Sequence, residues 1–119
     1  MSKIEKFEDL ICWQKSRQLV NDIYRLTMKD KITKDFALKE QIRRAAISVM
    51  LNISEGFARR SHKEFKQFLF ISHGSIAEVQ SALYISLDLN YISNEEFNTI
   101  YYKCSEISII ISGLIKSLN

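Results

Sequence analysis

Residues 34–60 read KDFALKEQIRRAAISVMLNISEGFARR, and their apolar side chains recur every three or four positions without an intervening proline. On a helix of 3.6 residues per turn, this spacing gathers the apolar side chains on one face. The stripe consists of Leu38, Ile42, Ala45, Val49, Ile53 and Phe57. We therefore expect one long helix over about residues 34–60, with Thr33 as its N-cap and Asp35 in its first turn.

Segments on both sides of this helix show the same period. Apolar residues recur at helical spacing over about residues 7–28 and in two later segments that begin near Ser61 and Ser93. Ser61 precedes Glu64 and Ser93 precedes Glu96, which is the spacing of a capping box at a helix start. Short connections make consecutive helices antiparallel. The sequence therefore predicts an all-α, antiparallel up-down-up-down four-helix bundle.

The composition fits a single domain over residues 1–119 and excludes several other classes. The chain is 46% hydrophobic and 26% charged, with no proline and three glycines, so neither disorder nor a turn-rich all-β fold is expected. It has no signal-peptide pattern and no apolar run near the roughly 20 residues of a transmembrane helix. Cys12 and Cys104 fit no metal or redox spacing, which predicts reduced, buried thiols in a cytoplasmic protein.

Two basic clusters flank the predicted helix over 34–60, in a chain of formal charge +3. The cluster at its end consists of Arg59, Arg60, His62, Lys63 and Lys66. The cluster around the preceding loop consists of Lys29, Lys31, Lys34 and Lys39. In an antiparallel bundle the two clusters lie at opposite ends. Each cluster is suited to nucleic-acid phosphates, and each is also consistent with ordinary solubilising charge.

A polar strip lies along another face of the same helix. It consists of Gln41, Arg44, Ser48, Asn52, Glu55 and Arg59. One interpretation is a surface that faces nucleic acid, with Arg44 and Arg59 on phosphates. The other is a solvated face or one that packs on a neighbouring helix. Glu55 favours the second interpretation, because a carboxylate repels phosphates.

Apolar residues also lie outside the core stripes of the last two predicted helices. These residues are Phe70, Ala77, Tyr84, Tyr102, Ile109 and Gly113. Single surface hydrophobic residues are normal, but a monomeric bundle buries only one face of each helix. Because these residues recur at helical spacing, they predict an interface between copies of this chain.

No arrangement of residues predicts an enzyme, a cofactor site or a metal site. His62 and His73 are the only histidines, and neither has a second histidine at metal-binding spacing. Ser72 and Ser75 are near His73 in sequence but point in other directions on a helix. A bundle that holds a metal or a small molecule is disfavoured, because the predicted core has no facing carboxylates or histidines.

All three glycines fall inside predicted helices rather than at helix ends. Gly56, Gly74 and Gly113 each cost about 1 kcal/mol there relative to alanine. We expect positions that tolerate this cost to be points where another helix approaches closely, and we expect Gly74→Leu to disrupt packing or assembly.

Residues 41–61, QIRRAAISVMLNISEGFARRS, resemble the signature of four-helix-bundle proteins encoded in intervening sequences of bacterial 23S ribosomal RNA genes, also labelled S23 ribosomal proteins. FEDLICWQKSRQLVNDIYRLT at 7–27 and HGSIAEVQSALYISLDLNYIS at 73–93 are similar to the family's first and third helices. The resemblance implies a homopentameric ring. It also implies a relationship to the accessory variability protein of diversity-generating retroelements, which binds nucleic acid and works with a reverse transcriptase.

The resemblance also bears on individual residues and on one departure from the family pattern. The positions that match the family's signature are Arg43, Arg44, Asn52, Glu55, Gly56, Gly74, Ser75 and Glu78. Family members often have proline near the middle of the second helix, where this sequence has Met50 and Leu51. We therefore expect an uninterrupted second helix.

Two functional hypotheses follow from the residues and from this resemblance. In the first, a non-enzymatic homo-oligomer without a cofactor presents a basic surface to RNA or DNA. The residues expected to contact phosphates are Arg43, Arg44, Arg59, Arg60, Lys63 and Lys66. In the second, the protein is an interaction scaffold, for example for a reverse transcriptase, and makes no contact with nucleic acid. Neither hypothesis involves a membrane.

Overall fold

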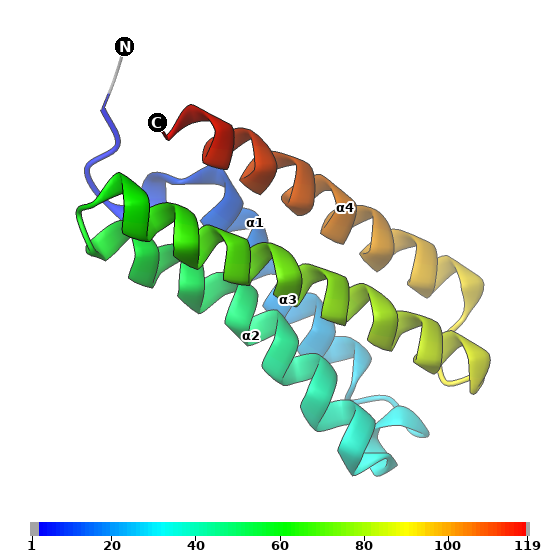
Figure 1. Ribbon diagram of the computed structural model, residues 1–119. Coiled ribbons are helices and arrows are strands. Elements are labelled where there is room, and N and C mark those ends of the chain that lie inside the picture. The colour runs from blue at the N-terminus through cyan, green and yellow to red at the C-terminus, as the bar shows by residue number, and fades with distance from the viewer. Residues whose placement is uncertain (1–2, 119) are drawn as a thin grey trace.

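Four long helices follow one another in the computed structural model, which describes residues 3–118. They are α1 (Ile11–Leu26), α2 (Phe36–Ala58), α3 (His62–Asp88) and α4 (Asn94–Ser117). Each helix runs opposite to the one before it and packs against its two neighbours, with α4 closing against α1 (Figure 1). The predicted all-α four-helix arrangement is confirmed. Residues 1, 2 and 119, which the single-domain prediction includes, lie outside the described part of the chain.

Helix α1 is shorter than the predicted segment over residues 7–28, and a residue with left-handed backbone follows the end of α3. Helix α1 begins at Ile11 rather than near residue 7, because Phe7–Asp9 form a separate 3₁₀ turn and Leu10 has extended backbone. Helix α3 ends at Asp88, and Asn90 adopts a left-handed conformation with φ of 60°. Asparagine tolerates this conformation better than most residues, so the chain can turn sharply there toward α4.

Helix α2 is uninterrupted, as expected, but its cap differs from the prediction. Thr33 lies in a 3₁₀ turn (Ile32–Lys34), and the N-cap is Asp35, whose carboxylate accepts a hydrogen bond from the Leu38 amide at 3.2 Å. The Tyr91 hydroxyl donates to the same carboxylate at 3.1 Å, and this hydrogen bond raises the pKa of Tyr91. Asp35 therefore links the start of α2 to the loop before α4.

One of the two predicted capping boxes is complete. At α4, the Glu96 amide donates to Ser93 Oγ at 3.0 Å, and the Ser93 amide donates to the Glu96 carboxylate at 2.9 Å. At α3, Ser61 Oγ accepts a hydrogen bond from the Glu64 amide at 3.3 Å. The Glu64 carboxylate lies 3.6 Å from the Arg59 guanidinium instead of closing the box, because the tight turn brings that cation within reach.

The core runs along the inside of the bundle and consists largely of the predicted stripes. Among its fully buried side chains are Leu19, Ile23, Ile42, Val49, Ile53, Leu69, Ile76, Val79, Leu83, Ile107 and Ile111. Cys12 and Cys104 are buried free thiols, as predicted. Burial raises the pKa of Cys12 to about 11 and that of Cys104 to about 12, so both thiols are neutral and unreactive near pH 7.

Helices α2 and α3 approach each other closely at Gly56. A Cβ atom at this position would lie 2.6 Å from the Cβ of Phe68 and 3.1 Å from a ring carbon of Phe65. The predicted close approach is therefore confirmed at Gly56. At Gly74 and Gly113 the prediction is wrong within the chain, because both are exposed and a Cβ there would meet no described atom within 4 Å.

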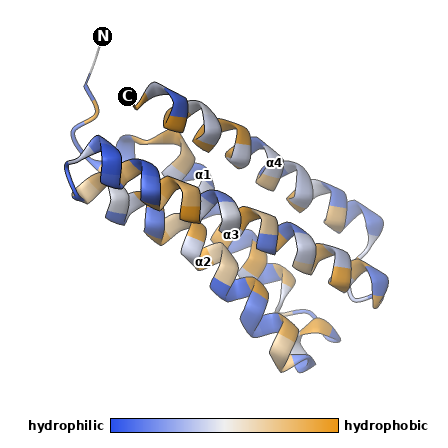
Figure 2. Ribbon diagram, viewed as in Figure 1, coloured by the Kyte–Doolittle hydropathy of each residue, from blue (hydrophilic) through white to orange (hydrophobic). Residues whose placement is uncertain are grey.

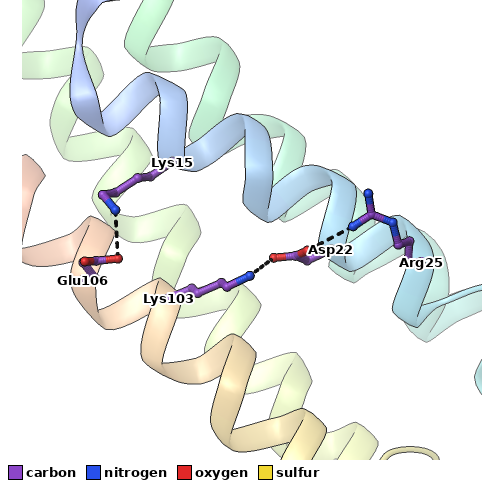
Figure 3. Close-up of polar contacts among 5 residues, drawn as sticks. All are labelled: Lys15, Asp22, Arg25, Lys103 and Glu106. Carbon is purple, nitrogen blue, oxygen red and sulfur yellow. Dashed lines mark hydrogen bonds and ion pairs between the residues drawn. The ribbon is translucent and has the colours of Figure 1, made fainter.

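Helices α1 and α4 are connected by ion pairs (Figure 3). Lys15 Nζ lies 3.3 Å from Glu106 Oε1, and Lys103 Nζ lies 2.6 Å from Asp22 Oδ2. The Asp22 carboxylate also lies 3.3 Å from Arg25 on its own helix. These contacts stabilise one particular register of α1 against α4.

Each of the four helices carries both hydrophobic and hydrophilic residues along its length (Figure 2). None of the helices in the described part of the chain combines the length and hydrophobicity that a membrane crossing requires.

Candidate nucleic-acid interface

The turn between α2 and α3 lies at the end of the bundle where the described part of the chain begins and ends (Figure 1), and its residues are largely basic. Arg59 follows α2, Ser61 caps α3, and Arg60 between them has a left-handed backbone with φ of 61°. This conformation costs a residue with a side chain roughly 1 kcal/mol, and it reverses the chain within a few residues. The reversal leaves the Arg60 side chain exposed.

Arg59 is engaged by its neighbours. Its Nη2 atom lies 2.9 Å from the Glu55 carboxylate and its Nη1 atom 3.6 Å from Glu64. The guanidinium also lies over the Phe68 ring, 5.0 Å from the ring centre. A phosphate at Arg59 would therefore compete with two carboxylates.

Three other basic residues near this turn are more available than Arg59. Arg60, His62 and Lys63 are exposed, and none of them forms an ion pair with another residue in the range 3–118. Lys66 is half-buried one turn further along α3.

The extended N-terminal segment adds a further lysine to this end. Lys3 lines a cavity of about 400 Å³ together with Arg60 and His62, and Phe57 and Phe65 form part of its apolar lining. Lys3 could not be assigned to this group from the sequence, because it lies far from Arg60 along the chain and outside any helical period. We call Lys3, Arg60, His62, Lys63 and Lys66 together the basic end.

Arg43 and Arg44 do not belong to the basic end. They precede Arg59 by four turns of α2, about 24 Å along the helix axis. Arg43 Nε donates a hydrogen bond to Thr27 Oγ1 at 2.7 Å, and the Arg43 guanidinium lies 4.3 Å from the centre of the Tyr24 ring. The six predicted phosphate-binding residues are thus divided between the α2–α3 turn and the α1–α2 face.

Most of the polar strip on α2 serves contacts within the bundle. The hydroxyls of Ser48 and Ser75 are hydrogen-bonded at 2.8 Å across the α2–α3 contact. Asn52 Nδ2 donates to the Ser48 carbonyl at 2.8 Å, and Glu55 pairs with Arg59. These contacts support the packing interpretation of the strip, although Gln41 and Arg44 at its start are exposed.

The lysines of the first loop lie at the opposite end of the bundle from the basic end, as predicted. Lys29 forms an ion pair with Glu96 of α4, and Lys39 lies over the Phe36 ring at 4.7 Å from its centre. Lys31 and Lys34 are exposed.

The six residues predicted for an interface between copies are all exposed: Phe70, Ala77, Tyr84, Tyr102, Ile109 and Gly113. Ile109 retains 73% and Tyr102 70% of its accessible surface. Tyr84 is partly covered by ring contacts with Phe97 and Tyr101, at 4.9 and 5.7 Å between ring centres. Their exposure agrees with the prediction that these six residues lie outside the core. A partner subunit that covers them stays a prediction.

His73 contacts α4 rather than the serines next to it in sequence. Its Nε2 atom lies 2.8 Å from Ser108 Oγ and 3.3 Å from Ser112 Oγ. Periodicity within one helix could not reveal these partners, because they lie on another helix. Over residues 3–118, no group of three or more histidines, cysteines and carboxylates is placed to hold a metal ion.

Comparison with known proteins shows which family this chain belongs to. The model of the family described as 23S rRNA-intervening sequence protein matches residues 8–113. The chain belongs to this family. It is similar in structure to a protein of unknown function from the S23 ribosomal protein family of Bacteroides thetaiotaomicron, with a TM-score of 0.82 and 25% sequence identity over 89% of this chain and 99% of that one. A search of curated proteins found no match.

In this 23S rRNA-intervening sequence protein, several positions of the family signature have packing roles. Arg43 joins α2 to α1, Ser75 is hydrogen-bonded to Ser48, and Gly56 admits the Phe68 side chain. Part of the family signature therefore consists of residues that pack α2 against α1 and α3. Arg44 and Glu78, two other signature positions, are exposed.

Proposed function

We propose that this protein binds the phosphate backbone of RNA or DNA through the basic end and catalyses no reaction. The observation that carries the proposal is the group formed by Arg60, His62 and Lys63 at an exposed tight turn, with Lys3 beside it. Arg60 and Lys63 are fully available to phosphates, because no carboxylate of residues 3–118 pairs with them. Such contacts are independent of base sequence.

Assembly into a homopentameric ring in the cytoplasm completes the proposal. Its support is the resemblance to the family and the exposed apolar stripe on α3 and α4. In a ring of identical subunits, the basic end recurs around one rim. The repeated cations sum to a stronger positive potential than a single chain of formal charge +3 provides.

The test is a charge reversal at the basic end. We expect Arg60→Glu combined with Lys63→Glu to weaken binding to a labelled 20-base-pair duplex by at least 10-fold near 50 mM salt, measured by fluorescence anisotropy. The matched control is Lys31→Glu with Lys34→Glu, which makes the same change in net charge at the other end. It should retain most of the affinity.

Salt dependence gives a second readout. Each phosphate contact on duplex DNA contributes a slope of about −0.9 to the logarithm of affinity against the logarithm of salt concentration. The basic-end variant should therefore have a shallower slope by about 2. Absence of binding at low salt, salt-independent affinity or equal losses in both variants would contradict the proposal.

A second candidate function is a protein-interaction scaffold, for example for a reverse transcriptase, as the relationship to the accessory variability protein implies. The exposed apolar side chains Tyr102 and Ile109 favour it, because such side chains suit protein contacts. Charge reversal at Arg60 and Lys63 distinguishes the two functions. Under the scaffold hypothesis this variant retains a reverse transcriptase in a pull-down, and wild type does not bind the duplex.

A further inference from the structure

The face formed by α1 and α2 contains a cavity of about 490 Å³ that combines aromatic and cationic side chains. Tyr24 contributes to it from α1, and Phe36, Lys39, Arg43 and Arg44 contribute from α2. The cavity lies away from the α2–α3 turn, because α2 carries these residues in its first half. It is therefore separate from the basic end.

Phe36 is unusually accessible for an aromatic residue on a folded helix. Its side chain keeps 70% of its accessible surface, although it occupies the first position of α2. The preceding residue, Asp35, is fixed by hydrogen bonds with Leu38 and Tyr91, so the backbone that carries the ring is held in place. A ring that is exposed and held in this way offers a flat surface for stacking.

Three cations border this ring and the cavity. The Lys39 ammonium lies 4.7 Å from the centre of the Phe36 ring. Arg43 is fixed through Nε by Thr27 and lies over Tyr24, which orients its guanidinium beside the cavity. Arg44 is exposed on the neighbouring side of the helix.

The charge of the cavity is positive overall. Within residues 3–118, Lys39, Arg43 and Arg44 form no ion pair with a carboxylate. Glu40 is the acidic side chain of the lining, so three cations stand against one carboxylate. An anionic ligand with a flat ring complements this arrangement.

We infer that this cavity binds unpaired nucleotides of single-stranded RNA or DNA, with a base stacked on Phe36 and the adjoining phosphates on Lys39 and Arg44. An aromatic platform beside backbone-binding cations is the arrangement by which proteins hold single strands without sequence preference. A duplex gains little from it, because its bases are already stacked within the helix. The inference rests on the proposed affinity for nucleic acid but uses another surface.

The experiment compares labelled oligo(dT) of 20 nucleotides with a 20-base-pair duplex, by fluorescence anisotropy at low salt. We expect Phe36→Ala to weaken binding of the single strand by roughly 5- to 100-fold, which corresponds to the loss of one stacked base. Phe36→Trp, which keeps a ring, should bind at least as tightly as wild type. Binding of the duplex should change less than 2-fold in either variant.

Met28→Ala is the matched control, because Met28 is 71% exposed and lies outside both the cavity and the exposed apolar stripe on α3 and α4. It should leave binding of the single strand unchanged. Thermal unfolding and sedimentation of each variant test for loss of fold or assembly, and Phe36→Ala should match wild type in both.

The outcomes separate this inference from the proposed function. If the duplex binds through the basic end and Phe36→Ala binds the single strand like wild type, the inference is wrong and the proposed function stands. If the single strand binds in a Phe36-dependent manner but the duplex does not bind, the proposed function is wrong. If neither binds, both are wrong. A change in sedimentation with Phe36→Ala would overturn the inference by assigning this face to subunit contact.

Discussion

Gly56 is a residue at which the chain has no space for even a methyl group. Replacement by alanine adds a Cβ atom 2.6 Å from that of Phe68, and this contact forces α2 and α3 apart. Alanine improves helix propensity by about 1 kcal/mol, while overpacking costs roughly 1–3 kcal/mol. We expect Gly56→Ala to lower the free energy of unfolding by about 1 kcal/mol, measured by urea denaturation.

Gly74→Ala is the control for this prediction. A Cβ at Gly74 meets nothing within 4 Å, so the gain in helix propensity is unopposed and stability should rise by up to about 1 kcal/mol. Opposite signs at Gly56 and Gly74 are the expected result. A stabilising Gly56→Ala would mean that α2 and α3 can separate at little cost.

At the level of single residues, the sequence predicted burial better than it predicted partners. The burial of Cys12 and Cys104 was predicted from the sequence, and the structure agrees. The contact of His73 with Ser108 and the position of Lys3 beside Arg60 could not be predicted. Periodicity describes one helix at a time, whereas these contacts depend on how separate segments are placed.

At the level of helices, the contact between α1 and α4 depends on charged side chains. Asp22 on α1 forms an ion pair with Lys103 on α4, with 2.6 Å between Oδ2 and Nζ, and a second one with Arg25 on its own helix (Figure 3). We expect Asp22→Asn to lower the free energy of unfolding by about 0.5–1 kcal/mol at low salt, because both cations lose a carboxylate partner. The loss should shrink in 1 M NaCl, where ion pairs are screened.

Asp30→Asn provides the comparison for this ion pair. Asp30 is exposed in the first loop, and no ion pair joins it to another described residue. Its removal should change the unfolding free energy by less than about 0.5 kcal/mol at either salt concentration. Equal effects of Asp22→Asn and Asp30→Asn would show that the α1–α4 ion pair contributes nothing measurable.

The helix boundaries show where local rules compete. The complete capping box at Ser93 was predictable from four consecutive residues. The cap of α2 was not, because Thr33 and Asp35 are both suitable cap residues and the choice depends on Tyr91, which reaches Asp35 from the loop before α4. Glu64 likewise pairs with Arg59 once the turn is folded.

At the level of the whole molecule, the exposed apolar stripe predicts assembly. We expect wild type to sediment as an oligomer at micromolar concentration, and Ile109→Asp to shift it toward monomer without lowering helix content. Ile109 is 73% exposed on α4, and an aspartate at this position would place a charge within the predicted apolar contact between subunits. Met28→Asp, at a 71% exposed loop residue outside the stripe, should sediment like wild type.

Gly74→Leu tests the same assembly at α3. A Cβ atom at Gly74 meets nothing within 4 Å in the chain, so loss of oligomer with unchanged helix content in Gly74→Leu would locate Gly74 at a subunit contact. A wild-type protein that sediments as a clean monomer at micromolar concentration would contradict the predicted assembly.

The sequence by itself determined the four helices and the residues of their inner faces, because apolar spacing, capping residues and the absence of proline act within each segment. It also separated the two basic clusters, since antiparallel helices place the loops at alternate ends. Only the tertiary structure decided which cations remain available. Arg59 is neutralised by Glu55 and Glu64, Arg43 is fixed against Tyr24, and Lys3 joins Arg60. The physical reason is that the charge a surface presents depends on distances between side chains of different segments, and those distances are set by packing.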